Sequence, residues 1–180
     1  MSGWLAMASA ILTVPWLILS LSVAGNKNMM VKGVEAAMLA AGTALTVYLL
    51  AALRRLLHEG YRFTGADLPL RLLIWVNIIA AGVSIPGLAI PTLEASLDMF
   101  SLVLVVILGI VQIIVGIRLL GLSADFQGLW RPYCYLNMGT GFCLAVTVLA
   151  PVGMITGAIE DVMLGTIFFQ IAALLKNSGT

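Results

Sequence analysis

Three acidic residues stand at equal spacing, and they are the side chains of this sequence whose type and position could do chemistry. Glu35, Asp98 and Asp161 follow one another at intervals of 63 residues. Around a common axis, three carboxylates would form a ring that attracts cations to the mouth of a pore. The interpretation that we favour places each acid in the first turn of a helix, where a carboxylate accepts hydrogen bonds from free backbone N–H groups.

Neutral polar side chains within apolar segments are a second candidate set. The set consists of Thr46, Gln112, Thr147 and Gln170. Burying an unpaired amide in hydrocarbon is costly, so each glutamine needs a protein partner or a wet cavity. The four residues could line a pore for a neutral solute. Their scatter over several segments instead favours hydrogen bonds between helices, which contribute about 1 kcal/mol each.

Two asparagines and two arginines recur at matching positions. Asn77 and Asn137 each precede a proline by 14 residues, and Arg55 and Arg118 each open an Arg-Leu-Leu motif. We expect all four near the inner ends of helices, where an asparagine caps or bridges the backbone and an arginine extends toward the lipid headgroups. A ligand-binding role for the asparagines is the less favoured alternative.

The remaining reactive residues form no catalytic or metal-binding pattern. His58 is the single histidine, and Cys134 and Cys143 are not at metal-ligand spacing. No combination of Ser, His and an acid has a supporting spacing. We therefore expect no enzyme activity, no catalytic residue, no metal and no cofactor. The basic residues form no patch interleaved with aromatics, so nucleic acid is not an expected partner.

The segments that would position the candidate residues form a repeat. Beyond the three acids, the 63-residue offset relates Arg55, Phe63, Gly65 and Pro69 to Arg118, Phe126, Gly128 and Pro132. Agreement across several residue types indicates three tandem units.

The composition indicates a membrane environment. Of the 180 residues, 62% are hydrophobic and 9% are charged, whereas a soluble domain carries about 25% charged residues. Segments of about 20 apolar residues match a hydrocarbon core of about 30 Å. They cover about 4–24, 34–53, 72–93, 99–120, 134–154 and 158–175. We expect an all-α integral membrane protein with a single domain, 1–180, and six transmembrane helices that carry no ionisable residue at mid-depth.

Each repeat unit is predicted to be a helical hairpin. The hairpins cover approximately 1–57, 70–120 and 133–176, and three equivalent hairpins suggest a pseudo-threefold bundle. Gly109 and Gly116 on the fourth segment would allow close contact between helices. Pro151 is expected to bend the fifth segment near its outer end.

The basic residues predict the orientation in the membrane. One side holds Arg54, Arg55, Arg62, Arg71, Arg118, Arg131 and Lys176, and the other holds Lys27 and Lys32. Short loops enriched in Lys and Arg stay in the cytoplasm. We therefore expect a multi-pass protein of a bacterial inner membrane with both termini in the cytoplasm. Trp130 and Tyr133 are expected in the aromatic belt at the membrane surface.

Two functions fit these observations. The favoured one is a non-enzymatic structural or accessory subunit that acts through helix packing, with lipid, other membrane subunits or further copies of itself as partners. It rests on uncharged spans, small-residue faces and the lack of a catalytic pattern. The alternative is a small homo-oligomeric channel or facilitator for a small neutral or cationic solute, which rests on the repeat, the acids and the buried amides.

Overall fold

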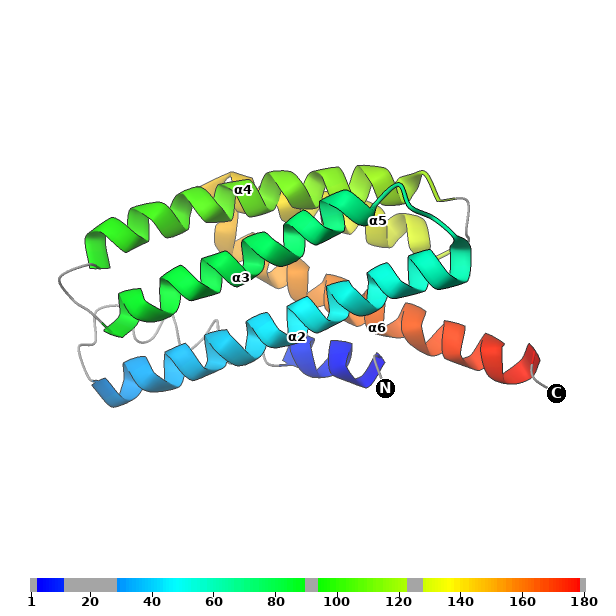
Figure 1. Cartoon of the computed structure of the whole chain (residues 1–180), viewed down its shortest axis with the longest axis horizontal. Coiled ribbons are helices and arrows are strands. Elements are labelled where there is room, and N and C mark those ends of the chain that lie inside the picture. Colours follow the sequence, from blue (N-terminus) through cyan, green and yellow to red (C-terminus); the bar gives the residue numbers. More distant parts are fainter. Residues whose placement is uncertain (1–2, 12–28, 90–93, 123–127, 179–180) are drawn as a thin grey trace.

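The computed structural model describes residues 3–11, 29–89, 94–122 and 128–178, and every regular element within them is helical (Figure 1). Residues 3–11 form the first helical segment. The others are α2 (Met29–Tyr61), α3 (Asp67–Ala89), α4 (Glu94–Leu120), α5 (Trp130–Ala145), the short 3-10 helix η1 (Thr147–Leu149) and α6 (Ala150–Ser178). The predicted all-helical fold is confirmed.

Helices that follow one another in the sequence pack against one another. α2 packs on α3, α3 on α4, α4 on α5 and α5 on α6, and α2, α3 and α4 lie side by side as long, nearly parallel rods (Figure 1). Their contact faces carry apolar residues at helical spacing, such as Leu49, Leu53 and Leu57 on α2. These residues belong to one buried cluster that also includes Leu119 and Trp130.

The contact between α4 and α5 depends on glycines. A Cβ atom on Gly141 would lie 2.6 Å from the backbone oxygen of Gly109 and 2.9 Å from the backbone nitrogen of Ile113. A Cβ atom on Gly116 would similarly lie 3.0 Å from the backbone oxygen of Cys134. The prediction that Gly109 and Gly116 allow close helix contact is confirmed.

A buried tryptophan closes the end of α4. The side-chain Nε1 of Trp130 donates to the backbone oxygen of Leu119 at 3.0 Å, and the Leu122 N–H donates to the same oxygen at 3.0 Å, so both lone pairs of this carbonyl at the helix end are used. Trp130 and Tyr133 are each only 1% exposed. The prediction that they lie in a belt at the membrane surface is therefore wrong, because both residues belong to the buried core cluster.

The connection between α2 and α3 is tight and charged. Arg62 has a φ of 50°, and the Phe63 N–H donates to the Leu57 carbonyl at 3.0 Å, which satisfies a carbonyl in the last turns of α2. Arg54 Nε lies 3.0 Å from Asp67 Oδ1, which joins the end of α2 to the first turn of α3.

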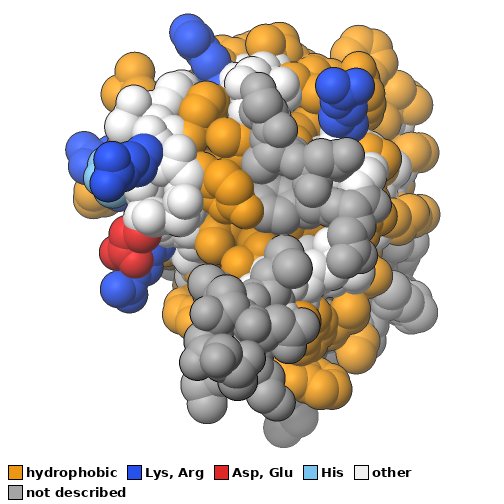
Figure 2. All heavy atoms as spheres, turned by 90° about the vertical axis from the view of Figure 1, so that its right-hand side faces the viewer, with side chains coloured by type: hydrophobic (Ala, Val, Ile, Leu, Met, Phe, Trp, Pro, Cys, Tyr) orange, Lys and Arg blue, Asp and Glu red, His pale blue; other side chains and the backbone are white. Residues whose placement is uncertain are grey.

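Among the described residues, four helices are long and apolar enough to cross a membrane. The candidate spans are Lys32–Tyr61, Asp67–Ile85, Met99–Leu120 and Thr147–Ala173. Large apolar side chains remain exposed on them, as a stripe on α4 shows: Ile107, Ile110, Ile114 and Ile117. One end of the molecule gathers Lys and Arg side chains around a hydrophobic surface (Figure 2).

The boundary between the last two helices differs from the prediction. α5 ends at Ala145, Val146 has an extended conformation (φ −94°, ψ 90°), and α6 begins at Ala150. Pro151 is therefore the second residue of α6, where its missing N–H costs nothing, and it does not bend α5. The apolar run that was predicted to be one helix, 134–154, is divided between α5 and α6.

The repeat itself stays a prediction. α3 and α5 begin 63 residues apart, at Asp67 and Trp130, as the repeat requires. α6 begins at Ala150, but α4 does not begin 63 residues earlier, because its first residue is Glu94.

Candidate functional site: a carboxyl pair facing a central cavity

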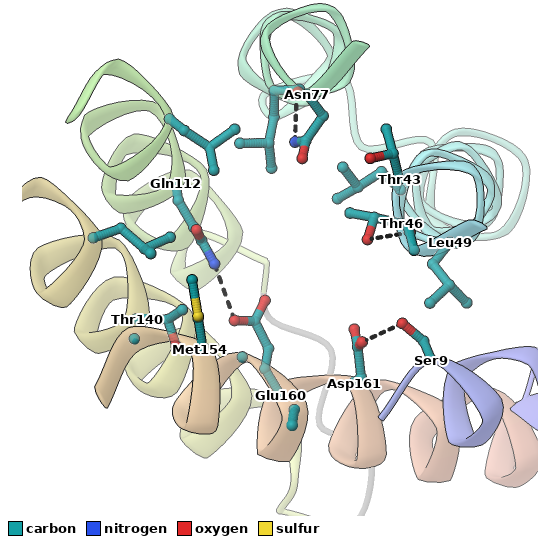
Figure 3. A pocket seen from close by; sticks show the side chains of 18 of the residues that line it. Ser9, Thr43, Thr46, Leu49, Asn77, Gln112, Thr140, Met154, Glu160 and Asp161 are labelled. Carbon is teal, nitrogen blue, oxygen red and sulfur yellow. Dashed lines mark hydrogen bonds between the residues drawn. The ribbon is translucent and has the colours of Figure 1, made fainter. Parts of the chain in front are cut away.

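A cavity of about 280 Å³ lies between the helices (Figure 3). The segment 3–11 and each of the α-helices α2 to α6 contribute to its wall. The polar residues of the lining are Ser9, Thr43, Thr46, Asn77, Gln112, Tyr133, Thr140, Glu160 and Asp161. Most of the remaining surface is Leu, Met and Gly. A largely apolar cavity with a few converging polar groups is the usual form of a small-molecule site.

Glu160 is held by two amide side chains. Nδ2 of Asn137 on α5 donates to Glu160 Oε1 at 2.5 Å, and Nε2 of Gln112 on α4 donates to Glu160 Oε2 at 3.1 Å. Glu160 is 9% exposed. A carboxyl group at such a depth needs hydrogen-bond donors to offset its lost hydration, and two helices supply them.

Asp161 accepts a hydrogen bond from the first helical segment. Ser9 Oγ, from the segment 3–11, donates to Asp161 Oδ2 at 2.6 Å. Because successive residues of a helix point about 100° apart, Glu160 faces α4 and α5, whereas Asp161 faces Ser9. Both carboxyl groups project from α6 into the cavity (Figure 3). Glu160 has two side-chain donors and Asp161 one, so Asp161 keeps the larger capacity to accept hydrogen bonds from a ligand.

The opposite wall is polar but uncharged. Thr43 and Thr46 project toward the cavity from α2, and Asn77 projects from α3 (Figure 3). Each of the three donates to a carbonyl of its own helix: Thr43 Oγ1 to Leu39 at 2.8 Å, Thr46 Oγ1 to Gly42 at 3.0 Å and Asn77 Nδ2 to Leu73 at 2.8 Å. The hydroxyl protons are thus used within the helix, and the oxygen lone pairs face the cavity.

The polar groups lie at one level along the helices. Thr46, Asn77, Gln112 and Glu160 each lie within three residues of the middle of a different candidate span. If these helices cross a membrane, the cavity is near its midplane.

The electrostatic character of the cavity is acidic. Glu160 and Asp161 are the two acidic residues among the described lining residues, and no Lys, Arg or His accompanies them there. No group of three or more His, Cys, Asp or Glu that could hold a metal ion occurs in the described part of the chain. The arrangement is suited to binding a positively charged organic group.

The structure corrects the expectation for the spaced acids. Glu35 is the seventh residue of α2 and Asp161 the twelfth of α6, and neither helix has an acid in its first turn. Both helices begin earlier than the apolar segments suggested, so helix capping is wrong for these two residues. The side chain of Asp98 lies outside the described residues.

The expectation that the spans lack ionisable residues is also wrong. Glu160 and Asp161 lie in the middle of the span Thr147–Ala173. The predicted segments 134–154 and 158–175 place Asp161 in the first turn of the sixth helix, because the apolar run through Pro151 indicates one continuous helix. Proline is favoured in the first turn of a helix. Pro151 was therefore the signal in the sequence that a helix begins there, which places Glu160 and Asp161 well inside it.

The four intramembrane polar candidates separate into two pairs. Thr46 and Gln112 line the cavity, and Gln112 also bonds to Glu160, as expected for a hydrogen bond between helices. Thr147 lies exposed on η1, and Gln170 lies on α6 outside the lining. The set as a whole does not converge on one axis.

The asparagines and arginines have different outcomes. Asn77 bonds to a backbone carbonyl, as expected, but it and Asn137 lie in the middle of α3 and α5 and cap neither helix. Arg118 lies in the last turn of α4, as predicted. Arg55 pairs with Glu59 on the exposed surface of α2, with 2.9 Å between Nε and Oε1.

The chain was compared with protein families, curated proteins and solved structures. No protein-family model, no curated protein and no solved structure matches this chain significantly.

Proposed function

We propose that the protein is a multi-pass membrane facilitator that takes a small cationic solute into the cavity beside Glu160 and Asp161. The observation that carries the proposal is the carboxyl pair itself: two acids in the middle of a membrane-length helix, facing a cavity without a described basic residue. This proposal develops the alternative that the sequence left open.

The cost of placing acids at this depth supports a functional role. Ionisable residues within membrane spans are expensive to bury, and they usually mark the path of an ion or substrate. Many secondary transporters bind their substrates near the membrane midplane, at sites formed by several helices. A cation that enters the cavity would pair with the carboxyl groups and reduce the cost of their burial.

An accessory subunit would need no such cavity. Exposed apolar faces such as that of α4 fit contact with lipid as well as contact with another subunit. Helix packing alone can be achieved with small and apolar residues. The acids and the cavity around them therefore favour the facilitator over the accessory subunit.

The proposal includes the orientation. Arg54, Arg55, Arg62 and Arg71 lie in and around the connection between α2 and α3. We propose that the end of the molecule where Lys and Arg side chains are seen (Figure 2) faces the cytoplasm. A solute would then pass between the outer side and this basic end.

Uptake into liposomes tests the function. Methylguanidinium is a suitable probe because a guanidinium group stays charged at neutral pH and the charged form crosses pure lipid poorly. We expect liposomes that contain the protein to take it up faster than empty liposomes. Asp161→Asn should lower the rate about tenfold, because a hydrogen bond to a charged group contributes about 1.5–3 kcal/mol.

A matched variant controls for charge. Glu59→Gln removes one carboxylate on the exposed surface, outside the cavity, and should leave the uptake rate unchanged. Equal rates with and without the protein would overturn the proposal, as would equal losses in the Asp161 and Glu59 variants.

A further inference from the structure

We propose that the solute is a small α,ω-diamine, with one ammonium group at Glu160 and Asp161 and the other at Thr43, Thr46 and Asn77 on the opposite wall. The inference rests on the proposed function, since it assigns a class of solute to the same cavity. It follows from the hydrogen bonds that the polar side chains of the two facing walls already make, and from the acceptors that these bonds leave unused.

The wall formed by α2 and α3 presents acceptors. The hydroxyl protons of Thr43 and Thr46 are donated to Leu39 and Gly42, so each Oγ1 can only accept a further hydrogen bond. Asn77 donates one of its two Nδ2 hydrogens to its own helix, and its Oδ1 adds an acceptor beside the remaining N–H. A ligand group that donates several hydrogen bonds satisfies such a wall best, and an ammonium group donates three.

The wall formed by α6 also presents acceptors. Ionised carboxylates only accept hydrogen bonds, and the donors that bind them, from Ser9, Gln112 and Asn137, leave some of their lone pairs unused. When both carboxyl groups are ionised, their two charges balance the two charges of a diamine, whereas a monoamine balances only one.

The space between the walls suits an alkyl chain. The lining between them is apolar and includes Leu49, Leu73 and Leu164. Each buried CH₂ group contributes about 0.8 kcal/mol. At about 30 Å³ for a water-sized group, the cavity of about 280 Å³ has room for the six heavy atoms of 1,4-diaminobutane.

A pair of amines of equal chain length tests the inference. The dissociation constants of 1,4-diaminobutane and butylamine would be measured by equilibrium dialysis on the purified protein in lipid nanodiscs. We expect the diamine to bind about tenfold more tightly, since it alone donates to both walls.

Two double variants locate the second ammonium group. Thr43→Val with Thr46→Val removes both acceptors and keeps the β-branched shape, so it should weaken diamine binding about tenfold and change butylamine binding less than twofold. Thr43→Ser with Thr46→Ser keeps the oxygen atoms and should keep the preference. The melting temperature of each variant shows whether it is folded.

The outcomes separate this inference from the proposed function. If both amines bind the wild type equally, or if the valine variant weakens both equally, the diamine assignment is overturned and the cation site stands. If neither amine binds and methylguanidinium uptake is absent as well, the proposed function fails together with it.

Discussion

At the scale of single residues, the site depends on how Glu160 is stabilised inside the protein. Two amide groups from two helices donate to its two oxygens. Charge-assisted hydrogen bonds of this kind are stronger than bonds between neutral groups. Asn137 is the more buried of the two donors, at 1% exposed, so water cannot replace it.

Removing Asn137 should therefore destabilise the fold. We expect Asn137→Ala to reduce the free energy of unfolding by about 1–3 kcal/mol, because it leaves Glu160 Oε1 buried without this donor. The measurement is the unfolding midpoint in mild detergent. Asn77→Ala is the matched control, since Asn77 bonds only to its own helix in the described structure and should cost less. A larger loss for Asn77→Ala would contradict this account of Glu160.

The sequence identifies some of these residues but not their partners. Gln112 stood out, because an amide within an apolar segment must find a hydrogen-bond partner. The bond between Ser9 and Asp161 joins residues 152 positions apart. No local pattern encodes such a pair, because it forms only when the first and last helical segments pack in three dimensions.

At the scale of elements, the helix boundaries decide where the acids lie. Apolar segments predicted the existence of each helix, since apolar runs of membrane length are a strong signal. The division between α5 and α6 was missed because both sides of Val146 are equally apolar. Because α6 begins at Ala150, Asp161 lies in the middle of a candidate span together with Glu160, and not in the first turn of a helix as predicted.

The tight packing of α5 on α4 gives a prediction at this scale. Gly141→Ala should destabilise the protein by about 1–3 kcal/mol, because the new methyl group meets the backbone of Gly109 and Ile113. Gly139→Ala changes the same helix at a position where a Cβ atom meets nothing within 4 Å. It should leave stability unchanged or raise it by up to about 1 kcal/mol, since alanine favours helices more than glycine does.

Thermal unfolding of the two variants under identical conditions provides the comparison. Similar midpoints for Gly141→Ala and Gly139→Ala would mean that α4 and α5 do not approach each other as closely as the structure shows.

At the scale of the whole molecule, the cavity brings together residues from the segment 3–11 and from the α-helices α2 to α6. Each contributing helix carries few polar groups, so each segment alone resembles an ordinary apolar span. The packing of the helices collects these groups at one level, near the middle of the four candidate spans. The sequence predicted the class of fold, but the cavity is a property of the assembled molecule.

Direct binding tests the central claim that the carboxyl pair forms a cation site. The measurement is saturable binding of radiolabelled methylguanidinium to the protein in lipid nanodiscs, for the wild type, Asp161→Asn and the surface control Glu59→Gln. The account predicts one bound cation per chain, affinity about tenfold lower for Asp161→Asn and unchanged affinity for Glu59→Gln. Absence of saturable binding to the wild type, or equal affinity of the wild type and Asp161→Asn, would contradict it.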